Sequence, residues 1–167
     1  ADDLTALSEA KPAGFAAVAT AADDVALFGP TSGSTGVPKV TAHFHRDLLS
    51  IDNTFGRHVL RLRPDDVVAC SAPFAFTFGL GGLLLFPLSI GAATLLIERP
   101  GPETLLPAIA AHRVSVLFTA PTSYRIMAAD AKHHDLSALV KCVSAGEMLP
   151  ASTRRLWKDA TGIEIID

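Results

Sequence analysis

Short apolar runs alternate with longer helix-like segments from residue 25 to the end of the chain, and this rhythm limits the possible folds. The runs are mostly apolar without strict alternation, which is typical of parallel strands buried on both faces. We therefore expect an α/β fold with a mostly parallel sheet flanked by helices. The predicted strands are Val25–Phe28, Val67–Ser71, Ala93–Ile97, Ser115–Ala120, Val140–Ser144 and Glu164–Ile166. The predicted helices are His45–Leu60, Gly79–Leu88, Glu103–His112, Thr122–Ala131 and Pro150–Ala160.

The composition is that of a globular protein. Hydrophobic residues make up 49% of the 167 residues and charged residues 19%, which excludes a disordered chain. The net charge of −3 gives no reason to expect a nucleic acid or an anionic membrane as partner. Cys70 and Cys142 each lie in an apolar run, as reduced core residues do. Because "ADDLTALSEA" lacks the features of a signal peptide, we expect a cytoplasmic protein.

Residues 67–97 contain no charged residue, which raises the alternative of a membrane-associated protein. The run is interrupted by two prolines and four glycines, namely Pro73, Pro87, Gly79, Gly81, Gly82 and Gly91. These residues divide it into a strand, a loop, a short helix and another strand. A buried α/β core is the favoured interpretation.

The two ends of the chain differ from its middle. Residues 1–22 are Ala-rich and weakly patterned, and we expect a short helix and a connector there, upstream of an α/β lobe over residues 23–167. The chain ends directly after the last predicted strand, at Asp167. Since ligands bind beyond the carboxyl ends of parallel strands, we expect Asp167 to be a cut point within a larger protein.

The stretch "TSGSTGVPK", Thr31 to Lys39, follows a predicted buried strand and is rich in hydroxyls and glycines. Glycines allow the backbone to approach a ligand, and successive N–H groups form an anion site to which Lys39 adds a positive charge. The pattern predicts a polyphosphate site. It is not the common P-loop, because Pro38 precedes the lysine and "KVTAHF" looks extended. An ordinary polar turn is the alternative.

This loop closely resembles the phosphate loop of the adenylate-forming superfamily, which includes acyl- and aryl-CoA ligases, luciferases and peptide-synthetase adenylation domains. "TAHFHRDLL" looks like the continuation in benzoate- and 2-aminobenzoate-CoA ligases. "APFAFTFGLGGLLLFPL", "VLFTAPTSYRIM" and "CVSAGEMLP" are similar, in the same order, to the aromatic-gate segment, the acyl-pocket wall and the turn beside the nucleotide. The sequence departs from the family at Pro30, where an aromatic residue is usual, and at Val40, where glycine is usual.

The resemblance implies an ATP-dependent aryl-acid–CoA ligase. In this reaction a carboxylate and ATP give an acyl adenylate and pyrophosphate, and CoA then displaces AMP. The ATP phosphates would be held by Thr31, Ser32, Gly33, Ser34, Thr35, Gly36 and Lys39. Gly146 and Glu147 would lie near the nucleotide and the acyl group. Phe76, Gly79, Tyr124 and Ala145 would contact the aryl acid, a benzoate or 2-aminobenzoate.

Several of these assignments have a plainer alternative. Phe76 is either the gate between acid and CoA or a core residue, since Phe74, Phe76 and Phe78 alternate as in a strand. Tyr124 is either a pocket residue or a tyrosine on a helix surface. Glu147 is either a ligand-binding residue or a charge at a helix N-terminus.

Histidines and arginines outside the loop give weaker signals. His43 and His45 would share one face of an extended segment; since a third ligand is not evident, they are expected to shape the acyl pocket rather than to bind metal. His133 and His134 are expected to be solvated. The run "RHVLRLR", residues 57–63, is either a basic helix end or a surface for CoA phosphates.

The resemblance also implies what lies beyond this sequence. The carboxylate that binds Mg²⁺, the adenine-stacking aromatic and the catalytic lysine of the family fall after residue 167. We therefore expect no catalytic residue and no metal ligand in this chain, and we expect the isolated chain to be inactive. The alternatives are a stand-alone nucleotide- or anion-binding module and a fragment of a medium-chain fatty-acid–CoA ligase.

Overall fold

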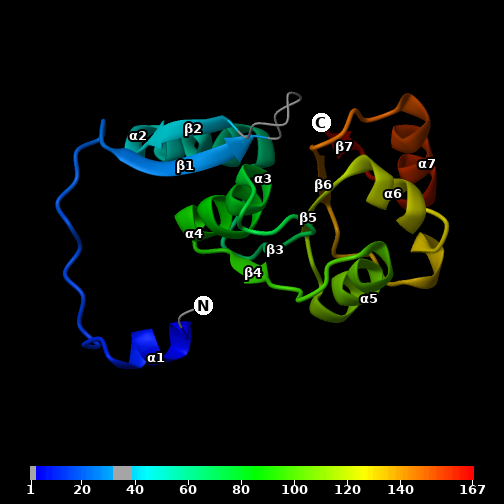
Figure 1. The fold of residues 1–167 in the computed structure, drawn as a ribbon. Coiled ribbons are helices and arrows are strands. Elements are labelled where there is room, and N and C mark those ends of the chain that lie inside the picture. The colour runs from blue at the N-terminus through cyan, green and yellow to red at the C-terminus, as the bar shows by residue number, and fades with distance from the viewer. Residues whose placement is uncertain (1–2, 32–38) are drawn as a thin grey trace.

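The computed structural model describes residues 3–31 and 39–167. Its centre is a five-stranded parallel sheet with strand order β4-β3-β5-β6-β7 (Figure 1). The strands are β3 (Val67–Cys70), β4 (Ala93–Leu95), β5 (Val116–Thr119), β6 (Lys141–Ser144) and β7 (Ile165–Ile166). The prediction of a mostly parallel α/β sheet is confirmed, and each of these strands falls inside or overlaps a predicted one.

Helices cover both faces of the sheet because successive strand residues point to opposite faces. On one face, Leu117 and Cys142 pack against α5 (Pro102–His112), α6 (Pro121–Met127) and α7 (Ala151–Thr161). On the other face, Phe118 and Val143 pack against a second set of helical segments. That set comprises the π-helical η1 (Asp52–Leu60) and η2 (Gly81–Leu85), together with α4 (Phe86–Ile90). Two separate apolar cores therefore hold the sheet. A short 3-10 turn, η3 (Ala131–His133), follows α6.

The first predicted strand is not part of this sheet, which corrects the expectation for Val25–Phe28. β1 (Val25–Thr31) pairs antiparallel with β2 (Lys39–Phe44) to form a separate two-stranded hairpin (Figure 1). The short connection of residues 32–38 explains the antiparallel pairing of β1 with β2, since a parallel pair needs a crossover of about a dozen residues or more. The extended conformation expected for "KVTAHF" is confirmed. α2 (His45–Ile51) follows and runs directly into η1.

The uncharged stretch 67–97 divides as expected. It forms β3, then α3 (Thr77–Leu80), η2 and α4 in direct succession, and then β4. Gly91, with φ of 75°, ends α4 in the left-handed conformation. Within the described residues, no helix is both long enough and apolar enough to cross a membrane.

The N-terminal segment begins with the short helix α1 (Leu4–Glu9), which is capped by the side chain of Asp3. Residues 14–20 then run without helix or strand toward the hairpin. The expected short helix is confirmed.

Candidate functional site

The carboxyl ends of β3, β5 and β6 lie side by side at one edge of the sheet. Thr119 and Ser144 are register partners there, so their side chains share a face, and Ser71 directly follows the last residue of β3. The hydroxyl oxygens of Ser71 and Thr119 are 2.6 Å apart and hydrogen-bonded. The hydroxyl of Ser144 is buried and has no hydrogen-bond partner among the described residues. The carboxyl ends of these strands therefore carry small polar side chains, whereas the strand residues before them are mostly apolar.

A largely apolar cavity of about 430 Å³, here called the edge cavity, opens at the same edge. Aromatic rings form much of its wall, because Phe78 and Phe86 both pack against Phe118 with ring centroids 5.5 and 6.1 Å away. The lining residues are Ile51, Phe55, Thr77, Phe78, Phe86, Phe118, Val143, Ser144, Ala145 and Asp167. A flat apolar ligand can make edge-on and stacked contacts with such rings. The cavity therefore suits an aromatic group.

The turn that follows β6 is held to the start of α6. Gly146 has a φ of 86°, a left-handed conformation that glycine adopts without strain. Oε2 of the next residue, Glu147, accepts hydrogen bonds from the backbone N–H of Thr122 at 3.2 Å and from its hydroxyl at 2.7 Å. Glu147 thus places its charge at the N-terminus of α6, a neighbouring helix, rather than at the helix that follows it in sequence.

The hairpin brings the two ends of the glycine-rich loop together. Thr31 and Lys39 are register partners at the end of the β1–β2 ladder. The rest of the predicted phosphate loop, Ser32, Gly33, Ser34, Thr35 and Gly36, lies outside the described residues. The phosphate-binding role of these residues remains a prediction.

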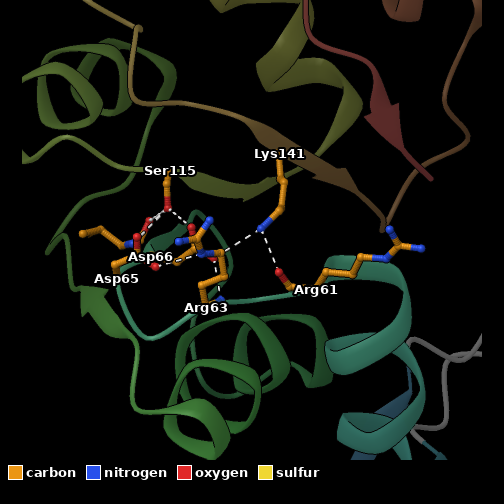
Figure 2. Close-up of polar contacts among 7 residues, drawn as sticks. Arg61, Arg63, Asp65, Asp66, Ser115 and Lys141 are labelled. Atoms are coloured by element: carbon orange, nitrogen blue, oxygen red, sulfur yellow. Dashed lines mark hydrogen bonds and ion pairs between the residues drawn. The ribbon is translucent and has the colours of Figure 1, made fainter.

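The opposite edge of the sheet carries a polar network centred on Asp66 (Figure 2). Its carboxylate accepts a hydrogen bond from the Ser115 hydroxyl at 2.7 Å and pairs with the Lys141 ammonium at 3.2 Å. Burial would raise the pKa of Asp66, but hydrogen bonds from Ser115, the Arg63 N–H and Lys141 outweigh it and hold the pKa below its ordinary value. The ammonium also donates to the backbone carbonyl of Arg61, as Figure 2 shows.

The run "RHVLRLR" ends at this network. η1 closes at Leu60, and Arg61 adopts the left-handed conformation that ends the helix. The run is therefore a basic helix end, as one interpretation of the sequence held. It lies by the amino ends of the strands, at the opposite edge from the edge cavity.

The histidines serve local structure. The Thr41 hydroxyl donates to the Gly29 carbonyl at 3.0 Å, so its oxygen accepts from Nε2–H of His43, also at 3.0 Å. His133 and His134 both contact the carboxylate of Asp130, and these hydrogen bonds lower its pKa. Across residues 3–31 and 39–167, no group of three or more His, Cys, Asp or Glu side chains could hold a metal ion.

The two cysteines are buried free thiols, as expected. Burial raises the pKa of Cys70 to about 11 and that of Cys142 to about 12. Since the thiolate is the reactive form, neither side chain is a nucleophile at neutral pH.

Comparison with known proteins identifies the family. A family model described as "AMP-binding enzyme" matches residues 2–167. The chain belongs to the AMP-binding enzyme family. The resemblance drawn from the glycine-rich loop and the segments after it is thereby confirmed.

Relatives within the AMP-binding family include several aryl-acid ligases. Benzoate–CoA ligase of Thauera aromatica is 38% identical over 99% of this chain and 32% of its own length. Anthranilate–CoA ligase of Pseudomonas aeruginosa is 36% identical over 82% of this chain and 26% of its own length. The chain therefore spans about a third or less of the length of these curated relatives.

Solved structures of AMP-binding enzymes share the fold. Anthranilate–CoA ligase AuaEII, in complex with anthranoyl-AMP, superimposes with a TM-score of 0.88 at 37% identity, over 95% of this chain and 32% of its own. A benzoate–CoA ligase from Burkholderia xenovorans superimposes with a TM-score of 0.82 at 32% identity, over 96% and 32%. These matches confirm the predicted fold, a mostly parallel α/β lobe.

Four residues were predicted to contact the acid, and the structure brings only part of this set together. Ala145 lines the edge cavity. Phe76 is 57% exposed and precedes α3, so the alternative of a core residue in a strand is wrong. Gly79 is buried, and a Cβ there would lie 2.2 Å from the Pro73 carbonyl oxygen. Close backbone packing therefore accounts for this glycine in the AMP-binding fold.

Tyr124 matches neither interpretation of the sequence. Its side chain has no exposed surface, which contradicts both a pocket wall and a helix surface. The hydroxyl lies 3.1 Å from the Leu117 carbonyl and 3.0 Å from the Val143 carbonyl, and the ring packs edge-on against Trp157. Tyr124 is a core residue because it lies on the face of α6 that packs against Leu117 and Cys142 of the sheet.

The sequence interpretation missed several walls of the edge cavity, above all Phe86, Phe118 and Val143. Strand alternation was the available signal for two of them. Phe118 and Val143 stand near the carboxyl ends of buried strands, on the face opposite Leu117 and Cys142. Phe86 gave no such signal, because its place depends on how η2 and α4 join.

Proposed function

We propose that this chain is the central lobe of an ATP-dependent aryl-acid–CoA ligase, with residues 1–22 as a connector and residues 23–167 as the lobe. The observation that carries the proposal is the aromatic-walled edge cavity next to the turn at Ala145 and Gly146. Ligands of open parallel sheets bind at this carboxyl edge. Relatives named benzoate– and anthranilate–CoA ligase support it.

The proposed reaction has two steps. The acid's carboxylate oxygen attacks the α-phosphorus of ATP. The bond between this phosphorus and the oxygen that bridges to the β-phosphate breaks. Pyrophosphate departs, and the product is an acyl adenylate. The thiol of CoA then forms a thioester at the acyl carbon, releasing its proton and AMP. Such chemistry depends mostly on holding the reacting groups in line and on stabilising developing charge.

We assign the phosphate role to the loop from Thr31 to Lys39. Its hydroxyls, its backbone N–H groups and the lysine would stabilise the negative charge that accumulates on the leaving pyrophosphate. Gly146 and Glu147 are assigned to the nucleotide side of the turn, and the exposed Phe76 to the passage between acid and CoA.

Mg²⁺ accompanies ATP in enzymes of this type, but the described residues do not form a site for it. No cluster of suitable side chains occurs in residues 3–31 and 39–167, so no step is assigned to a metal here.

The free, buried state of both cysteines agrees with the reducing, cytoplasmic location that we propose.

We propose benzoate or 2-aminobenzoate as the acid. The rings of Phe78, Phe86 and Phe118 offer edge-on and stacked contacts to a flat ring, whereas a flexible medium-chain acid would lose more conformational freedom in the same space. The observed lining thus favours an aryl acid over the fatty-acid alternative.

The test is acid-dependent exchange of labelled pyrophosphate into ATP, measured on the full-length protein that contains this chain. Exchange with benzoate or 2-aminobenzoate, and AMP release when CoA is added, is the expected result. Exchange with octanoate, and with neither aryl acid, would show that the substrate is a fatty acid and not an aryl acid. ATP binding without exchange for any acid would favour a nucleotide-binding module. We expect no exchange from residues 1–167 alone.

A further inference from the structure

A second apolar cavity, here called the hairpin cavity, lies next to the edge cavity. It has a volume of about 260 Å³ and lies between the β1–β2 hairpin and the segment formed by α3 and η2. Three side chains line both cavities: Ile51, Thr77 and Phe86. The two cavities therefore share a wall.

The ring of Phe86 is the largest part of that wall, and its neighbours hold it in place. It stacks on Phe118 at 20° between ring planes and tilts against Phe55 at a centroid distance of 5.6 Å. A Cβ on Gly81 would lie 2.9 Å from Cε2 of the ring, and one on Gly56 would lie 3.2 Å from Cδ1. Glycines at these two positions let the helical segments close on the ring from both sides. Phe86 is only 6% exposed, and its ring separates the two cavities as a partition.

The hairpin cavity is large enough to matter for ligand choice. An apolar cavity of about 150 Å³ is sufficient to bind benzene. Leu27, Leu48 and Leu85 supply apolar walls on the far side of the partition, while Thr41 and His43 supply a hydrogen-bonded polar end. Space for a larger acid thus exists in the fold, behind Phe86.

We propose that Phe86 sets the size limit of the acid by closing the edge cavity against the hairpin cavity. The proposal rests on the proposed function of the edge cavity as the acid site. It predicts that the protein accepts acids of the size of benzoate. It also predicts that the protein rejects acids with a second ring or a long substituent, such as 2-naphthoate or 4-propylbenzoate. Removing the partition would let the extension enter the hairpin cavity.

The experiment uses the full-length protein that contains this chain and compares kcat/KM for benzoate, 4-propylbenzoate and 2-naphthoate. In Phe86→Leu, the ratio of an extended acid to benzoate should rise about tenfold or more, which is the discrimination that small changes in an apolar pocket provide. Ile51→Ala opens the same wall at a partly exposed position, so it tests the partition even if Phe86→Leu folds poorly. Phe74→Leu is the matched control, since Phe74 lines neither cavity, and its ratio should stay at the wild-type value.

Calorimetric binding of the same acids separates the two proposals. If no acid is turned over, the ligase function fails, yet Phe86→Leu should still gain affinity for 2-naphthoate relative to benzoate. An unchanged ratio in both kcat/KM and affinity, for Phe86→Leu and Ile51→Ala with native circular dichroism, would overturn the role of Phe86. Equal use of benzoate and 2-naphthoate by the wild-type protein would also overturn it.

Discussion

Glu147 and Thr122 are joined by two hydrogen bonds, one from the backbone N–H and one from the hydroxyl of the threonine to the same carboxylate oxygen. The pair links the turn after β6 to the first turn of α6. Gly146, just before Glu147, adopts a left-handed conformation that glycine reaches without strain. We therefore expect the Glu147–Thr122 hydrogen bonds to fix the position of this turn.

We expect Glu147→Ala to lower kcat of the full-length protein about tenfold, because the turn loses both bonds and a ligand placed even 1 Å away reacts more slowly. Thr122→Val keeps the N–H bond and should lose less. Pyrophosphate exchange is the measurement. Met148→Ala is the control, as that side chain is 89% exposed. A wild-type rate in Glu147→Ala would show that the contact does not position the turn.

Asp66 makes the stability of the sheet dependent on pH. Its pKa is lower in the folded protein than in the unfolded chain, so folding favours the ionised carboxylate. This contribution is complete above the unfolded pKa of about 4 and disappears as the pH falls through the folded-state pKa. We expect Asp66→Asn to lower the free energy of unfolding by about 1–3 kcal/mol at pH 7.

The comparison of urea unfolding at pH 7 and pH 3 tests this expectation. The difference between wild type and Asp66→Asn should shrink at the lower pH. The neighbouring exposed Asp65, which pairs with Arg63, is the control, and Asp65→Asn should change stability by no more than about 0.5 kcal/mol. An equal difference at both pH values would contradict the role of the charge.

Gly79 should not tolerate even one methyl group. A Cβ would lie 2.2 Å from the Pro73 carbonyl oxygen and 2.5 Å from that of Ala72, and neither backbone atom can move alone. We expect Gly79→Ala to cost about 3 kcal/mol or more of stability in thermal unfolding. Gly14→Ala, where no atom lies within 4 Å, should be close to neutral. A stable Gly79→Ala protein would mean that the turn at Pro73 shifts freely.

Tyr124→Phe separates a core role from a binding role. The substitution removes the donor that lies near the Leu117 and Val143 carbonyls, and we expect a loss of about 1 kcal/mol in chemical unfolding. KM for the aryl acid should not change, because the side chain has no exposed surface. A raised KM with unchanged stability would show that Tyr124 contacts the acid.

Sequence patterns predicted the sheet because the relevant physics is local. Runs such as Val67–Cys70 and Val116–Thr119 are continuously apolar, and burial on both faces leaves few alternatives to a parallel strand. The pairing of β1 was not predictable in this way. Val25–Phe28 is as apolar as the other runs, and its partner was decided by the short connection to β2.

The site was less predictable than the fold, since a cavity is made by residues far apart in the chain. Ala145 could be placed by its position after a strand. Tyr124 could not, because the polarity of its hydroxyl favoured the surface, whereas in the structure this hydroxyl lies within hydrogen-bond distance of two carbonyls in the core. The wall at Phe86 depends on glycines at positions 56 and 81, whose role becomes visible only when the helical segments meet.

In the part of the chain that the structure describes, the β1–β2 hairpin shares no hydrogen-bonded ladder with the parallel sheet. The hairpin cavity lies between this hairpin and the segment formed by α3 and η2. A unit with few buried contacts opens locally at a lower free energy than the core around it. Amide hydrogens of β1 and β2 should therefore exchange with solvent before those of β3 and β5. We therefore expect the strands that carry Thr31 and Lys39 to open while Phe118 and its neighbours in the core remain protected. The proposed phosphate loop is thus carried by a part of the fold that opens at a lower free energy than the strand and helices that hold Phe118 and Phe86.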